Sequence, residues 1–253
     1  ENKHMRTRPL IIAHGGNSCA APQNSLAAFE QAVEIGVDAI ELDVNTTKDG
    51  HPVIFHGPNL KKTTGQEGSI HSLTLAQARQ LDIGSWKDPS FAEQRILTLQ
   101  EALEFARGKV RLAVDLKTID ILPTIVKSIQ DANMVDDVVI CGCSAAWAQQ
   151  VQACEPRLSV GLNMDSDMVA FAENNAAPVF HQTYLQEATR NHLSPLNINF
   201  NYVTESLIRL AHLRATHLWA WTVDDAEMMH QLITQGVDAI YTNFPQILMD
   251  ILD

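Results

Sequence analysis

Short apolar or β-branched runs alternate with amphipathic stretches along nearly the whole chain. The runs predict strands at residues 9–14, 39–44, 52–56, 110–117, 137–142, 158–163, 177–181, 198–200, 217–223 and 239–243. Apolar residues at helical spacing predict helices at 25–35, 74–81, 98–107, 120–132, 144–154, 166–174, 204–213 and 225–235, followed by a short terminal helix. In the first helix we expect Asn24 to be the N-cap and Gly36 the C-cap. The pattern as a whole is a repeated strand–helix unit.

About eight such units in a chain of 253 residues favour a TIM-type (β/α)8 barrel over an open doubly wound sheet. No Gly-x-Gly-x-x-Gly turn follows a predicted strand, which argues against a dinucleotide-binding sheet. We predict one catalytic barrel over residues 5–253, with a short insertion after the second strand at 57–97 that holds a loop and a small helix. Residues 1–4 precede Met5 and are expected to be an artificial remnant outside the fold.

Two distant segments of the chain resemble each other. QAVEIGVDAIELD at 31–43 and QLITQGVDAIYTN at 231–243 each predict a helix end, a glycine C-cap, a short turn and a strand. The copies differ where the strand ends, because Glu41 and Asp43 in the first correspond to Tyr241 and Asn243 in the second. The two acids are therefore not needed to form the turn, which indicates a chemical role.

The net charge of −12 argues against a nucleic-acid partner, because phosphate backbones attract basic surfaces. A small phosphorylated substrate is compatible with this charge, since a bound metal reverses the local sign. No stretch approaches the ~20 apolar residues of a membrane span, and no signal segment opens the chain, so we expect no stable membrane insertion and a cytoplasmic location. The oligomeric state is left open by these patterns.

Three carboxylates are expected at one end of the barrel. Side chains two apart on a strand share a face, so Glu41 and Asp43 point the same way, while Ile40 and Leu42 face the helices. The same alternation turns Asp115 inward on the strand 110–117. Carboxylate oxygens are the ligands that Mg²⁺ and Ca²⁺ prefer, so the three acids predict a site for one divalent cation.

Two histidines are expected at the same end. His14 ends the first strand, and His56 lies just past the apolar run at 52–55. A lone histidine in such a place is usually a structural hydrogen-bonding group. Two histidines beside a carboxylate-bound cation form a coherent general acid–base arrangement.

The segments that carry these residues resemble the glycerophosphodiester phosphodiesterase family. IIAHGG, PQNS, GVDAIELDV, TTKDGHPV and FHG are similar, in order, to its His-Arg-Gly, Pro-Glu-Asn-Thr, Gly-x-Asp-x-Ile-Glu-x-Asp-Val, Thr-x-Asp-Gly-x-x-Val and His-Asp motifs. LTLQEAL, LAVDLK, WAWTVDD and GVDAIYTNFP are similar to later motifs of the family. The resemblance covers nearly the whole chain and is weakest across 120–200.

The resemblance implies an enzyme of lipid and glycerol metabolism that hydrolyses glycerophosphodiesters to glycerol 3-phosphate and an alcohol. In the family's usual mechanism a glycerol hydroxyl attacks phosphorus, and water then opens the cyclic phosphate. Residue by residue, the resemblance implies that His14 and His56 are the acid–base pair. It implies that the metal ligands are Glu41, Asp43 and Asp115. The implied substrate-binding positions are Lys117, Trp221 and Gly15. Which histidine is the acid and which is the base stays open here.

Several positions depart from the family's motifs. Gly15 replaces the arginine of His-Arg-Gly and Gln23 the glutamate of Pro-Glu-Asn, so a cation and an acid are missing together. Gly57 replaces the aspartate after the second histidine, Asp115 stands in place of glutamate, and Asp224 stands in place of asparagine. The retained histidines and acids favour a working enzyme with altered phosphate recognition. Two alternatives are an enzyme for a different or bulkier phosphodiester, such as a lysophospholipid, and a non-catalytic homologue that binds phosphorylated ligands.

Overall fold

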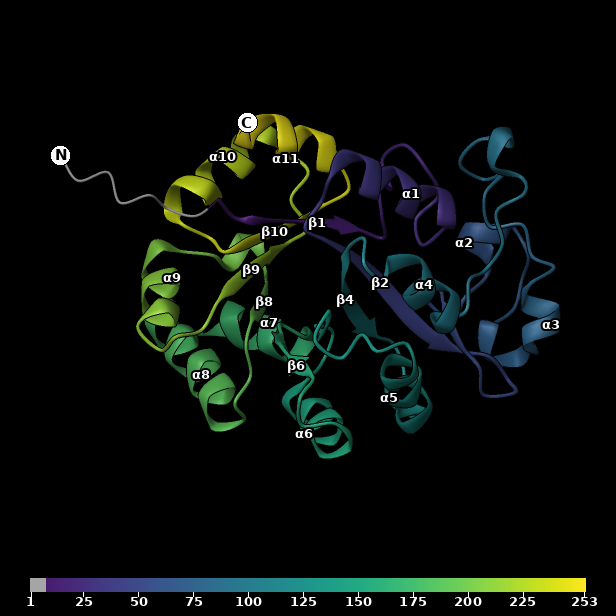
Figure 1. The fold of residues 1–253 in the computed structure, drawn as a ribbon. Coiled ribbons are helices and arrows are strands. Elements are labelled where there is room, and N and C mark those ends of the chain that lie inside the picture. Colours follow the sequence, from purple (N-terminus) through teal and green to yellow (C-terminus); the bar gives the residue numbers. More distant parts are fainter. Residues whose placement is uncertain (1–7) are drawn as a thin grey trace.

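Parallel strands form a nearly closed barrel, and helices surround it (Figure 1). The structure is a computed structural model that describes residues 8–253, so the expectation for residues 1–4 lies outside the described residues. The strand order is β6-β5-β4-β2-β1-β10-β9-β8-β7, and β3 pairs with β2 off this path. The predicted (β/α)8 barrel is confirmed.

The strands of the barrel path agree closely with the predicted runs. They are β1 (Leu10–His14), β2 (Ala39–Thr46), β4 (Arg111–Leu116), β5 (Val138–Ile140), β6 (Ser159–Val160), β7 (Leu162–Asn163), β8 (Leu196–Asn199), β9 (Leu218–Trp221) and β10 (Ala239–Thr242). The short strands β6 and β7 flank Gly161, where the chain changes from pairing with β5 to pairing with β8. Together they act as one barrel strand.

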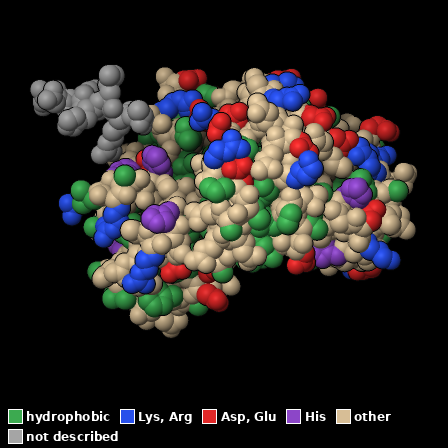
Figure 2. All heavy atoms as spheres, turned by 60° about the horizontal axis from the view of Figure 1, so that its bottom comes forward, with side chains coloured by type: hydrophobic (Ala, Val, Ile, Leu, Met, Phe, Trp, Pro, Cys, Tyr) green, Lys and Arg blue, Asp and Glu red, His purple; other side chains and the backbone are tan. Residues whose placement is uncertain are grey.

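The longer helices alternate with the barrel strands along the chain, and the last one follows the last strand. They are α1 (Leu26–Ile35), α4 (Leu99–Ala106), α5 (Leu122–Asp131), α6 (Ala145–Cys154), α7 (Ser166–Asn174), α8 (Ala177–Arg190), α9 (Glu205–His212), α10 (Ala226–Gln235) and α11 (Pro245–Leu252). None of the described helices is both long enough and apolar enough to cross a membrane. Acidic and basic side chains are interspersed over the face shown in Figure 2, without one large basic patch.

Two local predictions are wrong. The run at 177–181 begins helix α8 instead of forming a strand, and Pro178 lies in the first turn, where its missing N–H costs no helical hydrogen bond. The N-cap of α1 is Ser25, whose side chain accepts a hydrogen bond from the Ala28 amide. Asn24 has a positive φ of 62° and turns its side chain toward the barrel instead.

The repeated segments have the same backbone form. Helices α1 and α10 both end at a glycine in the left-handed region, with φ of 86° at Gly36 and 92° at Gly236. Each glycine amide donates back to carbonyls of the last helical turn, and a barrel strand follows. The predicted C-cap at Gly36 is therefore present in the structure.

The segment after β2 leaves the barrel. Strand β3 (Pro52–Ile54) runs antiparallel to β2, and the chain then forms α2 (Lys61–Thr64), α3 (Leu75–Ala78) and 3-10 turns at Ile70–Ser72 and Pro89–Phe91. This part lies at the periphery, on the right of Figure 1. It has an apolar cluster of its own, which includes Phe55, Leu60, Ile70 and Ile83. The small helix expected at 74–81 is present but shorter, and it ends at Ala78.

The barrel has two separate apolar layers. Ile40 and Leu42 belong to the large cluster between strands and helices, whereas Ala39 and Ala113 belong to the interior cluster. The alternation expected on β2 is thus present. It directs Glu41 and Asp43 to the barrel interior, because they share the face of Ala39.

Candidate active site

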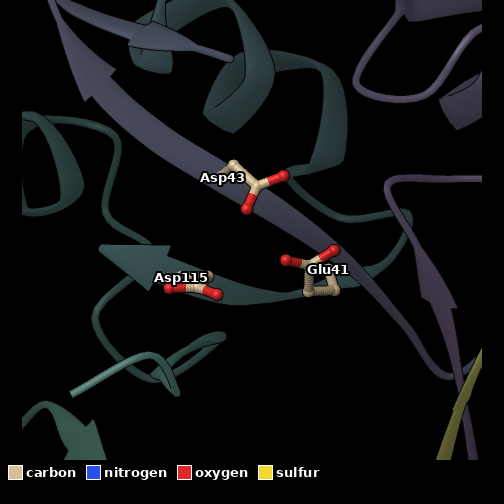
Figure 3. A group of neighbouring side chains, drawn as sticks. All are labelled: Glu41, Asp43 and Asp115. Atoms are coloured by element: carbon tan, nitrogen blue, oxygen red, sulfur yellow. The ribbon is translucent and has the colours of Figure 1, made fainter. Parts of the chain in front are cut away.

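Glu41, Asp43 and Asp115 converge at the carboxyl end of strands β2 and β4 (Figure 3). The two strands are parallel and place Asp43 directly beside Asp115. One oxygen from each of the three carboxylates lies within 4.8 Å of the others, so the group can hold a metal ion. Glu41 and Asp43 are 3% and 1% exposed, which makes their shared negative charge costly without a cation.

Lys117 supplies part of the missing positive charge. Its Nζ lies 3.0 Å from Asp43 Oδ1 and 2.8 Å from Asp115 Oδ2. Burial lowers the pKa of Lys117, but Asp115 and Asp43 outweigh it and leave that pKa above its ordinary value. The ammonium group therefore stays charged. One lysine still faces three acids.

Burial and the excess of acids over basic groups raise the pKa values of Glu41 and Asp115. Burial raises the pKa of Glu41 well above its ordinary value, and the charges of Asp43 and Asp115 raise it further. Burial also raises the pKa of Asp115, although Lys117 opposes the shift. Glu41 and Asp115 thus retain protons more readily than exposed carboxylates do, which fits buried acids that outnumber the neighbouring cation.

The loop after β1 and its neighbours hold the acids in place. The Gly15 amide donates to Glu41 Oε2 at 2.9 Å, and it also donates to the Glu41 carbonyl at 3.0 Å. Asn24 donates from Nδ2 to Asp43 Oδ2 at 2.7 Å. Gly142 lies against Asp115, because a Cβ on this glycine would stand 1.7 Å from Asp115 Oδ1. These three residues contact the carboxylates from two loops, the one after β1 and the one after β5.

His14 is oriented by two polar residues from the far end of the chain. Its Nδ1 lies 2.8 Å from Asn243 Oδ1, and Asn243 donates from Nδ2 to Asp224 Oδ2 at 2.7 Å. A carboxylate accepts and does not donate, so it fixes which way the amide of Asn243 points. The amide oxygen then faces His14, and Nδ1 must carry the proton. Nε2 is left as the acceptor, 3.9 Å from Glu41 Oε2.

His56 reaches the same site from outside the barrel. The Phe55 amide donates to the Asp43 carbonyl at 2.9 Å, which extends the pairing of β3 along β2 and brings the next residue to the barrel mouth. His56 itself is exposed.

One cavity of about 350 Å³ joins these groups. Seven of the eight predicted site residues line it: His14, Glu41, Asp43, His56, Asp115, Lys117 and Trp221. Gly15 is the exception, and its contact with the site is the hydrogen bond to Glu41. We name this space, at the carboxyl ends of the strands, the catalytic cavity.

Position 15 is closed by a neighbour. A Cβ on Gly15 would stand 2.1 Å from Cγ of Gln23, so the Gln23 side chain lies where a side chain on residue 15 would begin. Gly15 also has a φ of 64°, which disfavours other residues. The two departures from the family's motifs, at 15 and 23, thus meet in space.

Several residues of the cavity were not predicted. Asn163, Asn197, Tyr241 and Cys141 contribute to its lining. The Trp221 Nε1 and Asn197 Oδ1 atoms are buried and have no hydrogen-bond partner among the described residues. In the sequence, the one signal for these lining residues is their place in or near the strands of the barrel. Polar residues are common at such places, so this signal is weak. Asn24, Asn243 and Asp224 were missed as supports of the site, since their contacts depend on the tertiary fold.

Comparison with known proteins identifies the family. The profile of the glycerophosphoryl diester phosphodiesterase family matches residues 14–247. The chain belongs to this family. The assignment confirms the predicted class of enzyme, a phosphoric diester hydrolase.

Relatives and solved structures agree with it. A glycerophosphodiester phosphodiesterase of Caldanaerobacter subterraneus is 34% identical over 251 residues, which cover 97% of this chain and 98% of the relative. An Oleispira antarctica phosphodiesterase, solved in complex with the product sn-glycerol-3-phosphate, superposes with a TM-score of 0.83 at 25% identity over 97% of each chain. A glycerophosphodiester phosphodiesterase structure from Agrobacterium tumefaciens, 23% identical, shares the fold with a TM-score of 0.80 over 96% of this chain and 99% of its own.

Proposed function

We propose that this family member hydrolyses glycerophosphodiesters to glycerol 3-phosphate and an alcohol, with one divalent cation and two histidines. The observation that carries the proposal is the catalytic cavity, in which both histidines, three carboxylates and a lysine converge. Membership of the family and the product-bound Oleispira relative support the same substrate class.

Glu41, Asp43 and Asp115 are the proposed metal ligands. The donor set fits a hard cation, because all ligand atoms are carboxylate oxygens and the buried acids outnumber the nearby lysine. Mg²⁺ and Ca²⁺ are the proposed ions. When bound, such an ion supplies positive charge that offsets the charge of the phosphodiester.

His14 is the proposed general base of the first step. Because Asn243 holds its Nδ1 proton, the free Nε2 can take the proton from the glycerol hydroxyl next to the phosphodiester. The hydroxyl oxygen then bonds to phosphorus, and the phosphorus–oxygen bond to the alcohol breaks. Protonated His56 donates its proton to the departing oxygen. The products of this step are the alcohol and a cyclic glycerol phosphate.

The second step uses the same pair in reverse. His56, now neutral, takes a proton from water, and the water oxygen bonds to phosphorus. The bond from phosphorus to the attacking glycerol oxygen breaks, and His14 returns its proton to that oxygen. Glycerol 3-phosphate leaves, and both histidines have regained their starting protonation.

The remaining cavity residues are proposed to bind substrate. Lys117 carries a full positive charge and can pair with a phosphate oxygen. Trp221 and Asn197 line the cavity, and each has a buried polar atom without a hydrogen-bond partner among the described residues, so we propose that both contact the glycerol part of the substrate. A role in lipid and glycerol metabolism in the cytoplasm remains a prediction.

The test is hydrolysis of glycerophosphodiesters by the purified protein with Mg²⁺ or Ca²⁺. We expect release of glycerol 3-phosphate that is lost with EDTA, restored by added metal, and abolished in His14→Ala. Turnover of lysophospholipids alone would favour the alternative of a bulkier substrate. Binding of phosphodiesters without turnover of any of them at saturating metal would refute the proposal.

A further inference from the structure

A second cavity lies directly beside His56. It has a volume of about 220 Å³ and is lined by Gln23 from the loop before α1 and by residues of the segment after β3, among them His56, Gly57, Lys62 and Trp86. We call it the insertion pocket. His56 lines both this pocket and the catalytic cavity, so this residue stands at the boundary between the two.

The position of His56 indicates what enters the insertion pocket. In the proposed reaction His56 donates its proton to the departing alcohol oxygen, so the rest of the alcohol must extend past this side chain. The glycerol end of the substrate faces His14 and the carboxylates. The insertion pocket is therefore on the leaving-group side of phosphorus.

The walls suit a small polar molecule. The Trp86 indole is held by a hydrogen bond from its Nε1 to the Ile83 carbonyl at 2.8 Å and is about half exposed. At Gly57 a Cβ would meet nothing within 4 Å, so this wall is open space. The pocket volume corresponds to about seven water molecules at ~30 Å³ each. A single polyol or amino alcohol is of this size class.

The charge of the walls is the selective feature. Among the described residues, no aspartate or glutamate lines the insertion pocket, and Lys62 is the lysine that does. Lys61, next in the chain, pairs with Glu67 at 2.5 Å, whereas Lys62 has no ion pair among the described residues. Gln23 and Gly57 both line the pocket at positions where the family's motifs have an acid. The side-chain amide of Gln23 has no hydrogen-bond partner among the described residues.

We propose that the insertion pocket binds the alcohol portion of the substrate and selects a neutral or anionic polyol over a quaternary-ammonium alcohol. This inference rests on the proposed function. The unpaired ammonium group of Lys62 repels a cationic head group, and the Gln23 amide offers a donor and an acceptor to hydroxyl groups. Two acids that would attract a cation are absent from the wall.

The experiment compares kcat/KM for two diesters that differ in the leaving group, glycerophosphoglycerol and glycerophosphocholine. We expect the wild-type enzyme to prefer glycerophosphoglycerol. Lys62→Glu should shift the ratio toward glycerophosphocholine by about fivefold, since exposed charge pairs change free energies by up to ~1 kcal/mol. Gly57→Asp, placed in open space, should shift it the same way. Lys61→Glu changes the same charge outside the pocket and should leave the ratio unchanged.

The outcomes separate the two proposals. If the diesters are hydrolysed but neither Lys62→Glu nor Gly57→Asp changes the ratio of their kcat/KM values, the subsite is overturned and the proposed function stands. An equal shift in Lys61→Glu overturns it as well, because the effect would then be general electrostatics. Hydrolysis of neither diester, nor of any other glycerophosphodiester, at saturating Mg²⁺ or Ca²⁺ refutes the proposed function together with the subsite.

Discussion

At the residue scale, the most consequential contact is the chain of hydrogen bonds from Asp224 through Asn243 to His14. An isolated imidazole has two neutral forms, and only the form with a free Nε2 can act as the proposed base. Asp224 selects this form without touching His14, because it orients the amide of Asn243, which in turn contacts the imidazole. The family's motif has asparagine at this position, so the carboxylate gives this chain a stronger acceptor.

Asp224→Asn should lower kcat by about 10- to 100-fold, the usual cost of removing a supporting partner, with little change in KM. The amide of Asn243 is then free to turn, and His14 loses its fixed proton position. Steady-state kinetics across pH check this, because the acidic limb of the profile, which reports the deprotonated base, should also move. Asp131→Asn, an equal change on the exposed face of α5, is the control. Unchanged kinetics in Asp224→Asn would contradict the role.

Gly142→Ala should weaken binding of Mg²⁺ or Ca²⁺ by about 10-fold or more, since the added methyl group takes the place of an Asp115 oxygen. Titration calorimetry on the metal-free protein measures the change. Gly57→Ala adds the same group into open space and should leave metal affinity as it is. Equal affinities in all three proteins would remove Asp115 from the ligand set.

The strand ends predicted the acids and histidines of the site but not the residues that support them. Alternation along β2 and β4 is a local property, so the inward faces of Glu41 and Asp115 follow from sequence. Asn243 and Asp224 lie more than two hundred residues from His14, and their contacts exist only once β10 pairs with β1. The residue type of Asn24 predicts a helix cap, but asparagine suits a contact with a buried carboxylate equally well, and only the fold shows which role it has.

At the scale of elements, the repeated helix–glycine–strand unit determines where β2 and β10 begin. Gly36 and Gly236 both reverse the chain with a positive φ, which other residues adopt at a cost. Periodicity predicted these elements well. It failed at α8, where the apolar run at 177–181 is too short to separate a strand from a buried helical turn.

Gly236→Ala should lower the free energy of unfolding by about 1 kcal/mol, because alanine is strained in the left-handed region. Gly236→Asn should cost less, since asparagine tolerates this conformation. Urea unfolding of the three proteins tests the order. Alanine and asparagine variants of equal stability would contradict this explanation of the C-cap.

At the scale of the whole molecule, stability depends on contacts that tie neighbouring strand–helix units together. Glu155 ends α6 and accepts hydrogen bonds from Arg157 and from Gln130 of α5. The bond from Arg157, then that from Gln130, lowers the pKa of Glu155 to about 2 from 4.5. A lowered folded-state pKa stabilises the fold above about 4.5, and this contribution is lost as pH falls toward 2.

Glu155→Gln should therefore be less stable than the wild type at neutral pH, with a difference that shrinks between pH 4.5 and 2. Urea midpoints measured across this range test the expectation. Glu30→Gln, an exposed change on α1, should run parallel to the wild type. A difference for Glu155→Gln that stays constant with pH would exclude linkage through this carboxylate.

The contact between Gly15 and Gln23 also limits how this chain can change over generations. Because Gln23 lies where a side chain on residue 15 would start, Gly15→Arg alone meets a steric barrier and should lose activity or stability. Gln23→Glu keeps the Cγ atom that causes the clash but gives the arginine an ionic partner, so the two substitutions should be non-additive by about 0.5–3 kcal/mol. A change at one of the two positions is therefore best tolerated when the other position changes with it.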